Sequence, residues 1–303
     1  MLDLDASLVA QPALAARIVA GSGLRIDARD LGPRLRVYAT RRAMAELGAR
    51  LDEREGDGEG CPVIFYGSGD FHHLSTRFIQ RARVVVTVIH FDNHPDWVRF
   101  PPTHNCGGWV NRALALPHVG RVVTIGPCSD DLSRPEYKTA NLRAVANGRL
   151  EVHAWRHAPS GVLGEYGDTP GWRQQGRALH WRALASQDWD AFLSSLIARL
   201  PATALWITLD KDVLGPAEAC TNWDQGAMPL DHVLTALERL AGAREIAGVD
   251  ICGEWSPPLF TDPLRAILAR LDHPANDTPS AQALAVNDAT NARLLECFER
   301  VLH

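Results

Sequence analysis

Short apolar runs rich in Val and Ile alternate along the chain with segments whose apolar residues recur every three or four positions. The short runs predict buried β-strands, and the wider spacing predicts amphipathic helices. The expected strands are 62–66, 84–91, 121–125, 150–154, 204–209 and 245–251. The expected helices are 74–83, 136–146, 189–200, 230–240 and 281–302. This alternation predicts a three-layer α/β/α fold around a mostly parallel sheet.

The first sixty residues precede this regular alternation. They predict one strand at 35–40 and one helix at 42–51, followed by an exposed polar loop at 52–60. We therefore expect a single domain over 1–303, with an N-terminal extension at 1–60, a core at 61–260 and C-terminal helices at 261–303.

Composition and charge exclude several classes of protein. The formal net charge of -5 argues against a nucleic-acid partner. The six cysteines form no C-x-x-C pair, which is typical of buried thiols in a reducing compartment. The N-terminus lacks the basic region of a signal peptide, and no apolar run reaches the roughly 20 residues that span a membrane. We expect a cytoplasmic protein without a membrane partner.

Four of the expected strands are followed directly by the densest polar clusters of the chain. These clusters are GSGDFHH from Gly67, DNHPDW from Asp92, DKD from Asp210 and CGEWSPP from Cys252. Open parallel sheets bind ligands beyond the carboxyl ends of their strands. The sequence therefore predicts a functional site at this edge.

The residue types at this edge indicate metal binding. Asp92, His94 and Asp96 alternate after one strand, and Asp210 and Asp212 alternate after another. Each cluster alone also fits an exposed turn, but four neighbouring carboxylates repel one another unless cations lie between them. We therefore expect two metal ions. A donor set rich in oxygen, with imidazole and without thiolate, favours Mn²⁺ and leaves Ni²⁺, Co²⁺ and Fe²⁺ open.

The four clusters, in this order, resemble the metal-binding motifs of the ureohydrolase superfamily of arginases and agmatinases. GSGDFHH is similar to their G-G-D-H segment, HFDNHPD to D-A-H-x-D, TLDKDVLGP to S-x-D-x-D-x-x-D-P, and GVDICGEWSPP to D-x-x-E-x-x-P. The resemblance covers about residues 61 to 260. It implies an arginase-like fold, two Mn²⁺ per chain, and hydrolysis of a guanidino group of a linear amidine to an amine and urea.

The resemblance also implies residue roles. It assigns the metal ligands as His72, Asp92, His94, Asp96, Asp210 and Asp212. Because Phe71 is an extra residue in the first motif, His73 is the alternative to His72. Asp96 is expected to orient the attacking water and to pass a proton to the leaving amine. Glu254 is expected to bind the substrate guanidinium.

The chain departs from the arginase pattern in the loop after Asp96, which reads WVRFPPTHNCGGW. Arginases carry there a polar run that holds a free amino acid and ends in a proton-shuttle histidine. His104 and Asn105 are weak substitutes, and the shuttle stays unassigned. Gly215 also replaces a frequent aspartate.

Four tryptophans, at positions 97, 109, 223 and 255, lie in the motif loops. We expect Trp97 and Trp223 to contact substrate and at least two of the four to pack the loops. This pattern resembles the peptide arginases, which convert arginine within peptides to ornithine. A hydrolase of a small guanidino compound such as agmatine or guanidinobutyrate is one alternative, and a non-catalytic binding protein of the same fold is another. The oligomeric state is left open.

Overall fold

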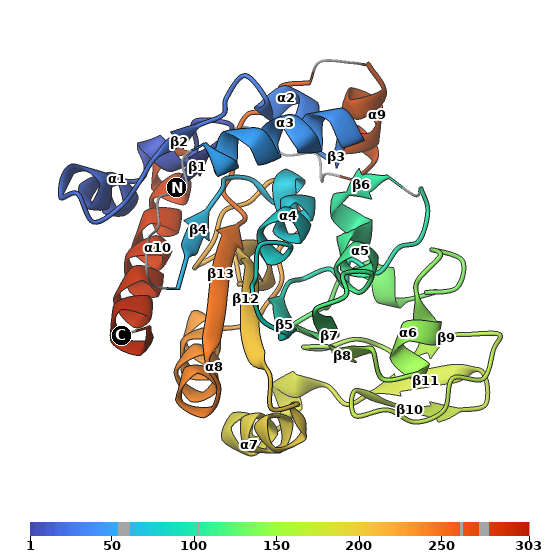
Figure 1. Cartoon of the computed structure of the whole chain (residues 1–303). Helices are drawn as coiled ribbons and strands as arrows, with labels where there is room; N and C mark the ends of the chain where they lie inside the picture. Colours follow the sequence, from blue (N-terminus) through green and yellow to red (C-terminus); the bar gives the residue numbers. More distant parts are fainter. Residues whose placement is uncertain (54–60, 102, 261–262, 273–278, 303) are drawn as a thin grey trace.

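The computed structural model describes residues 1–53, 61–101, 103–260, 263–272 and 279–302. Its centre is a six-stranded sheet in which every neighbouring pair is parallel (Figure 1). The strand order across the sheet is β4 (Val63–Phe65), β13 (Ile246–Cys252), β12 (Ala204–Asp210), β5 (Val86–Phe91), β7 (Val119–Ile125) and β8 (Leu150–His153). Each strand corresponds to one predicted apolar run, so the prediction of a parallel central sheet is confirmed.

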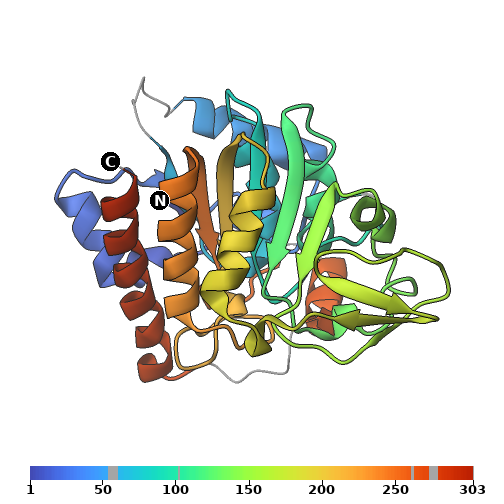
Figure 2. The same ribbon diagram turned by 90° about the horizontal axis from the view of Figure 1, so that it is seen from below.

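Helices cover both faces of this sheet, because successive side chains of each buried strand point to opposite faces. On β5, Val86 and Val88 belong to one hydrophobic cluster, and Ile89 and Phe91 belong to the other. The first cluster includes residues of α3 (Arg41–Asp52), α4 (Ser75–Ile79) and α5 (Trp109–Ala113). The second includes residues of α7 (Trp189–Arg199), α8 (Leu230–Ala243) and α10 (Ala281–Val301), and Figure 2 shows these three helices across one face. The three-layer prediction is confirmed.

Several predicted elements are shorter than expected. The strand expected at 35–40 is reduced to β3 (Tyr38–Ala39), which follows α2 (Gly32–Leu35), because Val37 has a φ of 66° that no strand accommodates. The helix expected at 74–83 is a 3₁₀-helix (Gly69–Leu74) followed by α4. Of the helix expected at 136–146, only the last part forms, as α6 (Leu142–Ala146). Of the loop expected at 52–60, residues 54–60 lie outside the described residues.

The remaining elements surround this core. A small antiparallel sheet of β9 (Ser160–Gly161), β11 (Ala178–Trp181) and β10 (Trp172–Gln175) was not predicted. Near the N-terminus, β1 (Leu2–Asp3) pairs with β2 (Ile26–Asp27), and α1 (Pro12–Val19) contacts α10. Strand β6 (His104–Asn105) pairs with β3, and α9 (Pro263–Asp272) precedes α10. None of the helices in the described ranges combines the length and apolarity needed to cross a bilayer.

The connectivity places two polar strand ends side by side. From β5 the chain continues to β7 and β8 on one side, and β12 and β13 lie on the other. The switch of direction therefore falls between β5 and β12, where Phe91 is paired with Leu209. Ligands of open parallel sheets bind at such a switch point. Asp92 and Asp210, at the carboxyl ends of these two strands, therefore lie where a site is expected.

Candidate metal centre

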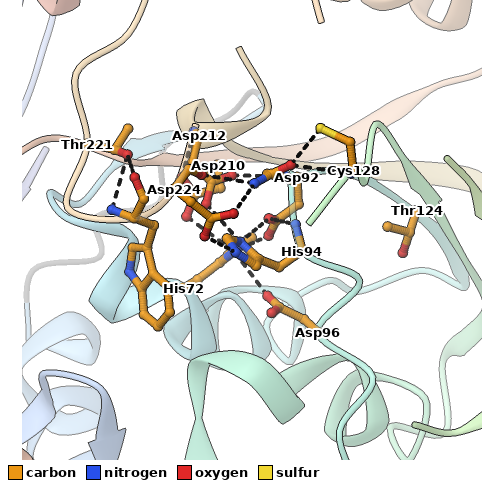
Figure 3. Close-up of polar contacts among 12 residues, drawn as sticks. His72, Asp92, His94, Asp96, Thr124, Cys128, Asp210, Asp212, Thr221 and Asp224 are labelled. Carbon is orange, nitrogen blue, oxygen red and sulfur yellow. Dashed lines mark hydrogen bonds and ion pairs between the residues drawn. The ribbon is translucent and has the colours of Figure 1, made fainter. Parts of the chain in front are cut away.

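The predicted donors lie close together at this edge (Figure 3), in overlapping groups that share His72 or Asp92. The Nδ1 atom of His72 lies 2.9 Å from Asp92 Oδ2, 3.3 Å from Asp96 Oδ2 and 3.6 Å from Asp210 Oδ2. The Nδ1 atom of His94 lies 3.0 Å from Asp212 Oδ2 and 3.4 Å from Asp92 Oδ1. Asp92 contacts both histidines, and all of these side chains except that of His94 are buried.

The structure distinguishes the two histidines of the first motif. The ring of His72 points into the donor group, and its Nε2 atom lies 3.0 Å from Thr208 Oγ1. His73 is equally buried, but neither of its ring nitrogens has a hydrogen-bond partner. Burial lowers the pKa of His73 to about 3. The geometry therefore favours His72 over His73 as a donor.

The backbone turns sharply at Asp96. Its φ of 47° lies in the left-handed region, which aspartate enters more readily than most residues. The extended conformation that would align alternate residues thus ends before Asp96, yet its carboxylate still reaches the donor group. The indole Nε1–H of Trp109 donates to Asp96 Oδ2 over 2.6 Å and fixes this orientation.

The buried carboxylates resist being ionised together. Burial and the charge of Asp92 raise the pKa of Asp96 to about 8 and also raise the pKa of Asp210. Burial, followed by the charges of Asp210 and Asp92, raises the pKa of Asp212 well above its ordinary value. Burial acts in the same direction on Asp92, but hydrogen bonds from three histidines hold its pKa well below the usual range. Cations at this position would favour the ionised form of all four groups.

The spacing of the donors fits divalent cations. Ligands about 2.0–2.1 Å from an octahedral ion lie about 3 Å apart when adjacent and about 4 Å apart when opposite. The distances from His72 Nδ1, between 2.9 and 3.6 Å, match adjacent positions. The donors line a small cavity of about 50 Å³. The residues present therefore fit the two ions that the sequence predicts.

Further polar contacts orient these donors. The Nε2 atom of His94 lies 2.8 Å from Asp224 Oδ1, and Asn93 donates to the same carboxylate over 3.0 Å. The thiol of Cys252, whose pKa burial raises, donates to Asp210 Oδ2 over 3.2 Å. Such partners fix the tautomer and direction of metal-binding side chains. Sequence reasoning assigned no role to Asp224, although its loop partly resembles the family counterpart.

His90 is a second residue that sequence reasoning missed. It lies inside β5, and its Nε2 atom is 2.8 Å from Asp92 Oδ2. Burial lowers the pKa of His90 to about 4, so its ring is neutral at pH 7. Its spacing could have revealed it in the sequence, because His90 lies two positions before Asp92 and so extends the alternation of Asp92, His94 and Asp96 into the strand.

Glu254 is buried and already paired. Its Oε1 atom accepts hydrogen bonds from Lys211 Nζ and, over 2.8 Å, from Asn291 Nδ2. Its Oε2 atom accepts from Gln11 Nε2 over 3.1 Å. The side chain of Lys211 is fully buried, and Glu254 is not among the residues that line the metal cavity. The carboxylate expected to bind guanidinium is thus neutralised by a cation of the chain itself, which sequence reasoning also missed.

The tryptophans divide into two kinds. Trp97 and Trp109 are completely buried, so the expectation that Trp97 offers surface to a substrate is wrong. Trp97 packs in the hydrophobic core, and its carbonyl oxygen accepts the Asn141 amide over 3.0 Å. Trp223 lines the metal cavity, with its ring 5.5 Å from that of His94. Trp255 lines a separate pocket beside α10.

Gly253 is required where the chain passes Asp210. Its φ is 92°, and a Cβ atom there would lie 2.4 Å from Asp210 Oδ1 and 2.5 Å from the Lys211 amide nitrogen. We expect Gly253→Ala to displace Asp210 and to weaken metal binding by about 10- to 100-fold, the range for a lost supporting contact. Metal titration of the purified variant measures this. Gly242→Ala in α8, where a Cβ meets nothing within 4 Å, is the control and should bind metal as wild type does; equal affinities in the two variants would contradict the prediction.

No protein-family model matches the chain. The chain is 26% identical over 198 residues to a protein of Thermotoga maritima whose function is uncharacterized. That match covers 65% of this chain and spans 60% of the relative's length.

Solved structures show a clearer likeness. The arginase of Bacillus cereus is similar with a TM-score of 0.56 and 16% identity, over 95% of this chain and 89% of that one. Formimidoylglutamase of Bacillus subtilis gives a TM-score of 0.53 and 15% identity, over 88% and 71% of the two chains. Proclavaminate amidino hydrolase of Streptomyces clavuligerus gives 0.50 and 13%, over 88% and 76%. The chain therefore has the arginase-like fold of the ureohydrolases, as its motifs predict.

Proposed function

We propose that this protein is a two-metal hydrolase that cleaves the guanidino group of arginine within a peptide, releasing urea and leaving ornithine. The observation that carries the proposal is the pair of donor groups that share Asp92, buried at the carboxyl edge of an arginase-like sheet. We propose Mn²⁺ for both positions, because carboxylate oxygens outnumber the other donors. When bound, two such ions supply a water activated for attack on the guanidinium carbon near neutral pH.

The side chains around the ions have separate tasks in this proposal. Asp96 holds the attacking water and then passes a proton to the leaving amine, while the Trp109 N–H keeps its carboxylate in place. His94 stays oriented through its Asp224 partner. A guanidinium remains cationic at ordinary pH, so the acidic residues around the cavity also favour its entry.

The shape beside the metal cavity supports a substrate larger than a free amine. A groove of about 680 Å³ adjoins the cavity and shares with it the lining residues His94, Cys106, Gly107, Asp131 and Trp223. The cavity itself, at about 50 Å³, is much smaller than this groove. We therefore place the guanidino group in the cavity and the rest of the substrate in the groove.

The lining of the groove suits a peptide. It includes Tyr38, Val98 and Phe100, and Phe100 is 70% exposed. The acidic lining residues Asp130 and Asp131 already pair with Lys138. A free amino acid brings a zwitterionic end that needs charged partners when it is buried, whereas a peptide replaces those charges with amides and neighbouring side chains.

The test is a direct comparison of substrates. Manganese-loaded protein is offered arginine-containing peptides, the same peptides with lysine in place of arginine, free arginine, agmatine and guanidinobutyrate. We expect urea and a mass loss of about 42 Da per converted arginine, as hydrolytic removal of the CN₂H₂ unit requires, with the arginine peptides alone. Turnover of free arginine or agmatine with no peptide reaction would reject the peptide substrate and support a small-molecule hydrolase. Peptide binding without urea formation would reject catalysis and support a non-catalytic binding protein.

A further inference from the structure

His90 is a buried ring whose two nitrogens face different surroundings. On one side, Nδ1 lies 3.0 Å from Thr124 Oγ1 of the neighbouring strand β7. On the other side, Nε2 lies 2.8 Å from Asp92 Oδ2 and 4.0 Å from Asp96 Oδ2. Figure 3 shows Thr124 apart from the carboxylates, and the ring of His90 contacts both Thr124 and Asp92.

We propose that His90 is itself a metal ligand and supplies a second imidazole to the position formed by His72, Asp92 and Asp96. The proposal rests on the two-metal centre proposed above and adds a donor that the family motifs do not include. The position would then be bound by two histidines and two aspartates, from β5, the loop after it and the 3₁₀-helix after β4.

Distances support direct ligation. One donor atom each from His72, His90, Asp92 and Asp96 lie within 4.8 Å of one another. The separations of His90 Nε2 from the two carboxylates, 2.8 and 4.0 Å, match adjacent and opposite ligands of an octahedral ion, which lie about 3 and 4 Å apart. His72 Nδ1 and His90 Nε2 both approach the same oxygen of Asp92 within 3 Å. A cation between them would satisfy both imidazoles at once.

The surroundings also prepare His90 for this role. A bound cation would replace the proton on Nε2, and the ring would then carry its proton on Nδ1, the atom that lies 3.0 Å from Thr124 Oγ1. Aromatic contacts hold the ring in place, because its centroid lies 5.1 Å from that of His72 and 5.0 Å from that of Trp109. Thr208 and Asp224 likewise contact the second ring nitrogens of His72 and His94. All three rings therefore have one nitrogen fixed by a neighbour and the other facing donors.

A second imidazole reduces the preference of this position for Mn²⁺ without removing it. Carboxylates suit Mn²⁺, whereas nitrogen donors add to the affinity for ions such as Co²⁺, which lies above Mn²⁺ in the Irving–Williams order. We therefore expect His90→Gln to lower the affinity for Co²⁺ by more than about tenfold, the smallest loss that removal of a merely supporting partner causes. Its affinity for Mn²⁺ should fall less, so the ratio of the two dissociation constants, measured by competition titration, should change.

The decisive measurement counts the bound histidines. The protein is loaded with two equivalents of Co²⁺, and hyperfine-shifted, solvent-exchangeable imidazole N–H signals are recorded by proton NMR. Each cobalt-bound ring whose other nitrogen keeps its proton gives one signal. We expect three signals from the wild type, for His72, His90 and His94, and two from His90→Gln.

The matched control is His153→Gln. His153 is also a buried strand histidine, and its Nε2 atom lies 2.6 Å from Glu151, a carboxylate two positions away. It belongs to no donor group, so this variant should keep three signals. Two signals from the wild type would overturn the proposal even if His90→Gln does not fold. Failure of the wild type to bind Co²⁺ would instead overturn the two-metal centre of the proposed function, and so the two failures are distinguishable.

Discussion

Replacing Asp210 with alanine should remove tight binding of both ions and reduce urea formation by on the order of a thousandfold or more, the scale seen when a main electrostatic stabiliser is lost. The carboxylate of Asp210 shares a donor group with His72 and Cys252 and also contacts the backbone of Asp212. Its Oδ2 atom is 3.6 Å from His72 Nδ1, and its Oδ1 atom accepts the Asp212 amide over 3.1 Å. Elemental analysis of the dialysed protein and a urea assay measure the two effects.

We expect Asp210→Ala to fold as the wild type does. Burial and the charge of Asp92 raise the pKa of Asp210, so the metal-free variant should be at least as stable as metal-free wild type. The matched control is Asp190→Ala in α7, which removes an exposed carboxylate paired with Arg239 and should change little. An Asp210→Ala protein that retains two ions per chain would refute the assignment.

Glu254→Gln should reduce the free energy of unfolding by about 3–5 kcal/mol, the usual cost of breaking a buried ion pair by removing one partner. The side chains of Lys211 and Glu254 are 0% and 1% exposed. The glutamine would leave the Lys211 ammonium without a countercharge, since its remaining partner, Asn291 Oδ1 at 3.1 Å, is neutral. Denaturant unfolding of the metal-free protein measures the change.

A double variant separates this structural role from substrate binding. In Lys211→Met combined with Glu254→Gln no charge remains unpaired, so most of the lost stability should return. The resemblance to ureohydrolases instead predicts that Glu254 binds the substrate guanidinium. Wild-type stability of Glu254→Gln together with a raised KM would support that role and reject the structural one.

The central sheet could be predicted because its strands are buried on both faces and therefore form continuous apolar runs. The small sheet of β9, β10 and β11 could not, because its strands have two to four residues and a mixed polar pattern. The strand expected at 35–40 is shorter than predicted because Val37 has a positive φ angle, which no local sequence pattern indicates. Local sequence thus predicts elements that burial dictates, and it misses elements that tertiary contacts select.

The donors of the candidate site were predictable for a related reason: charged residues directly after buried strands are conspicuous. His90 was missed because it lies inside the apolar run, where a histidine looks like part of the strand. Lys211 was missed because it lies between two expected ligands, and its partner Glu254 is 43 positions away. The burial of Trp97 depends on how its loop folds back, which is a property of the whole molecule.

The two donor groups combine residues that are far apart in the chain, since His94 and Asp212 are separated by 118 positions. The complete set exists only after β5 and β12 have paired, so the unfolded chain would bind the ions weakly. By mass action, each tenfold excess of free ion over its dissociation constant then adds about 1.4 kcal/mol per position to the free energy of unfolding. A chelator would therefore act on this protein as a denaturant does, and the metal supply of the cell would help to set how long each copy survives.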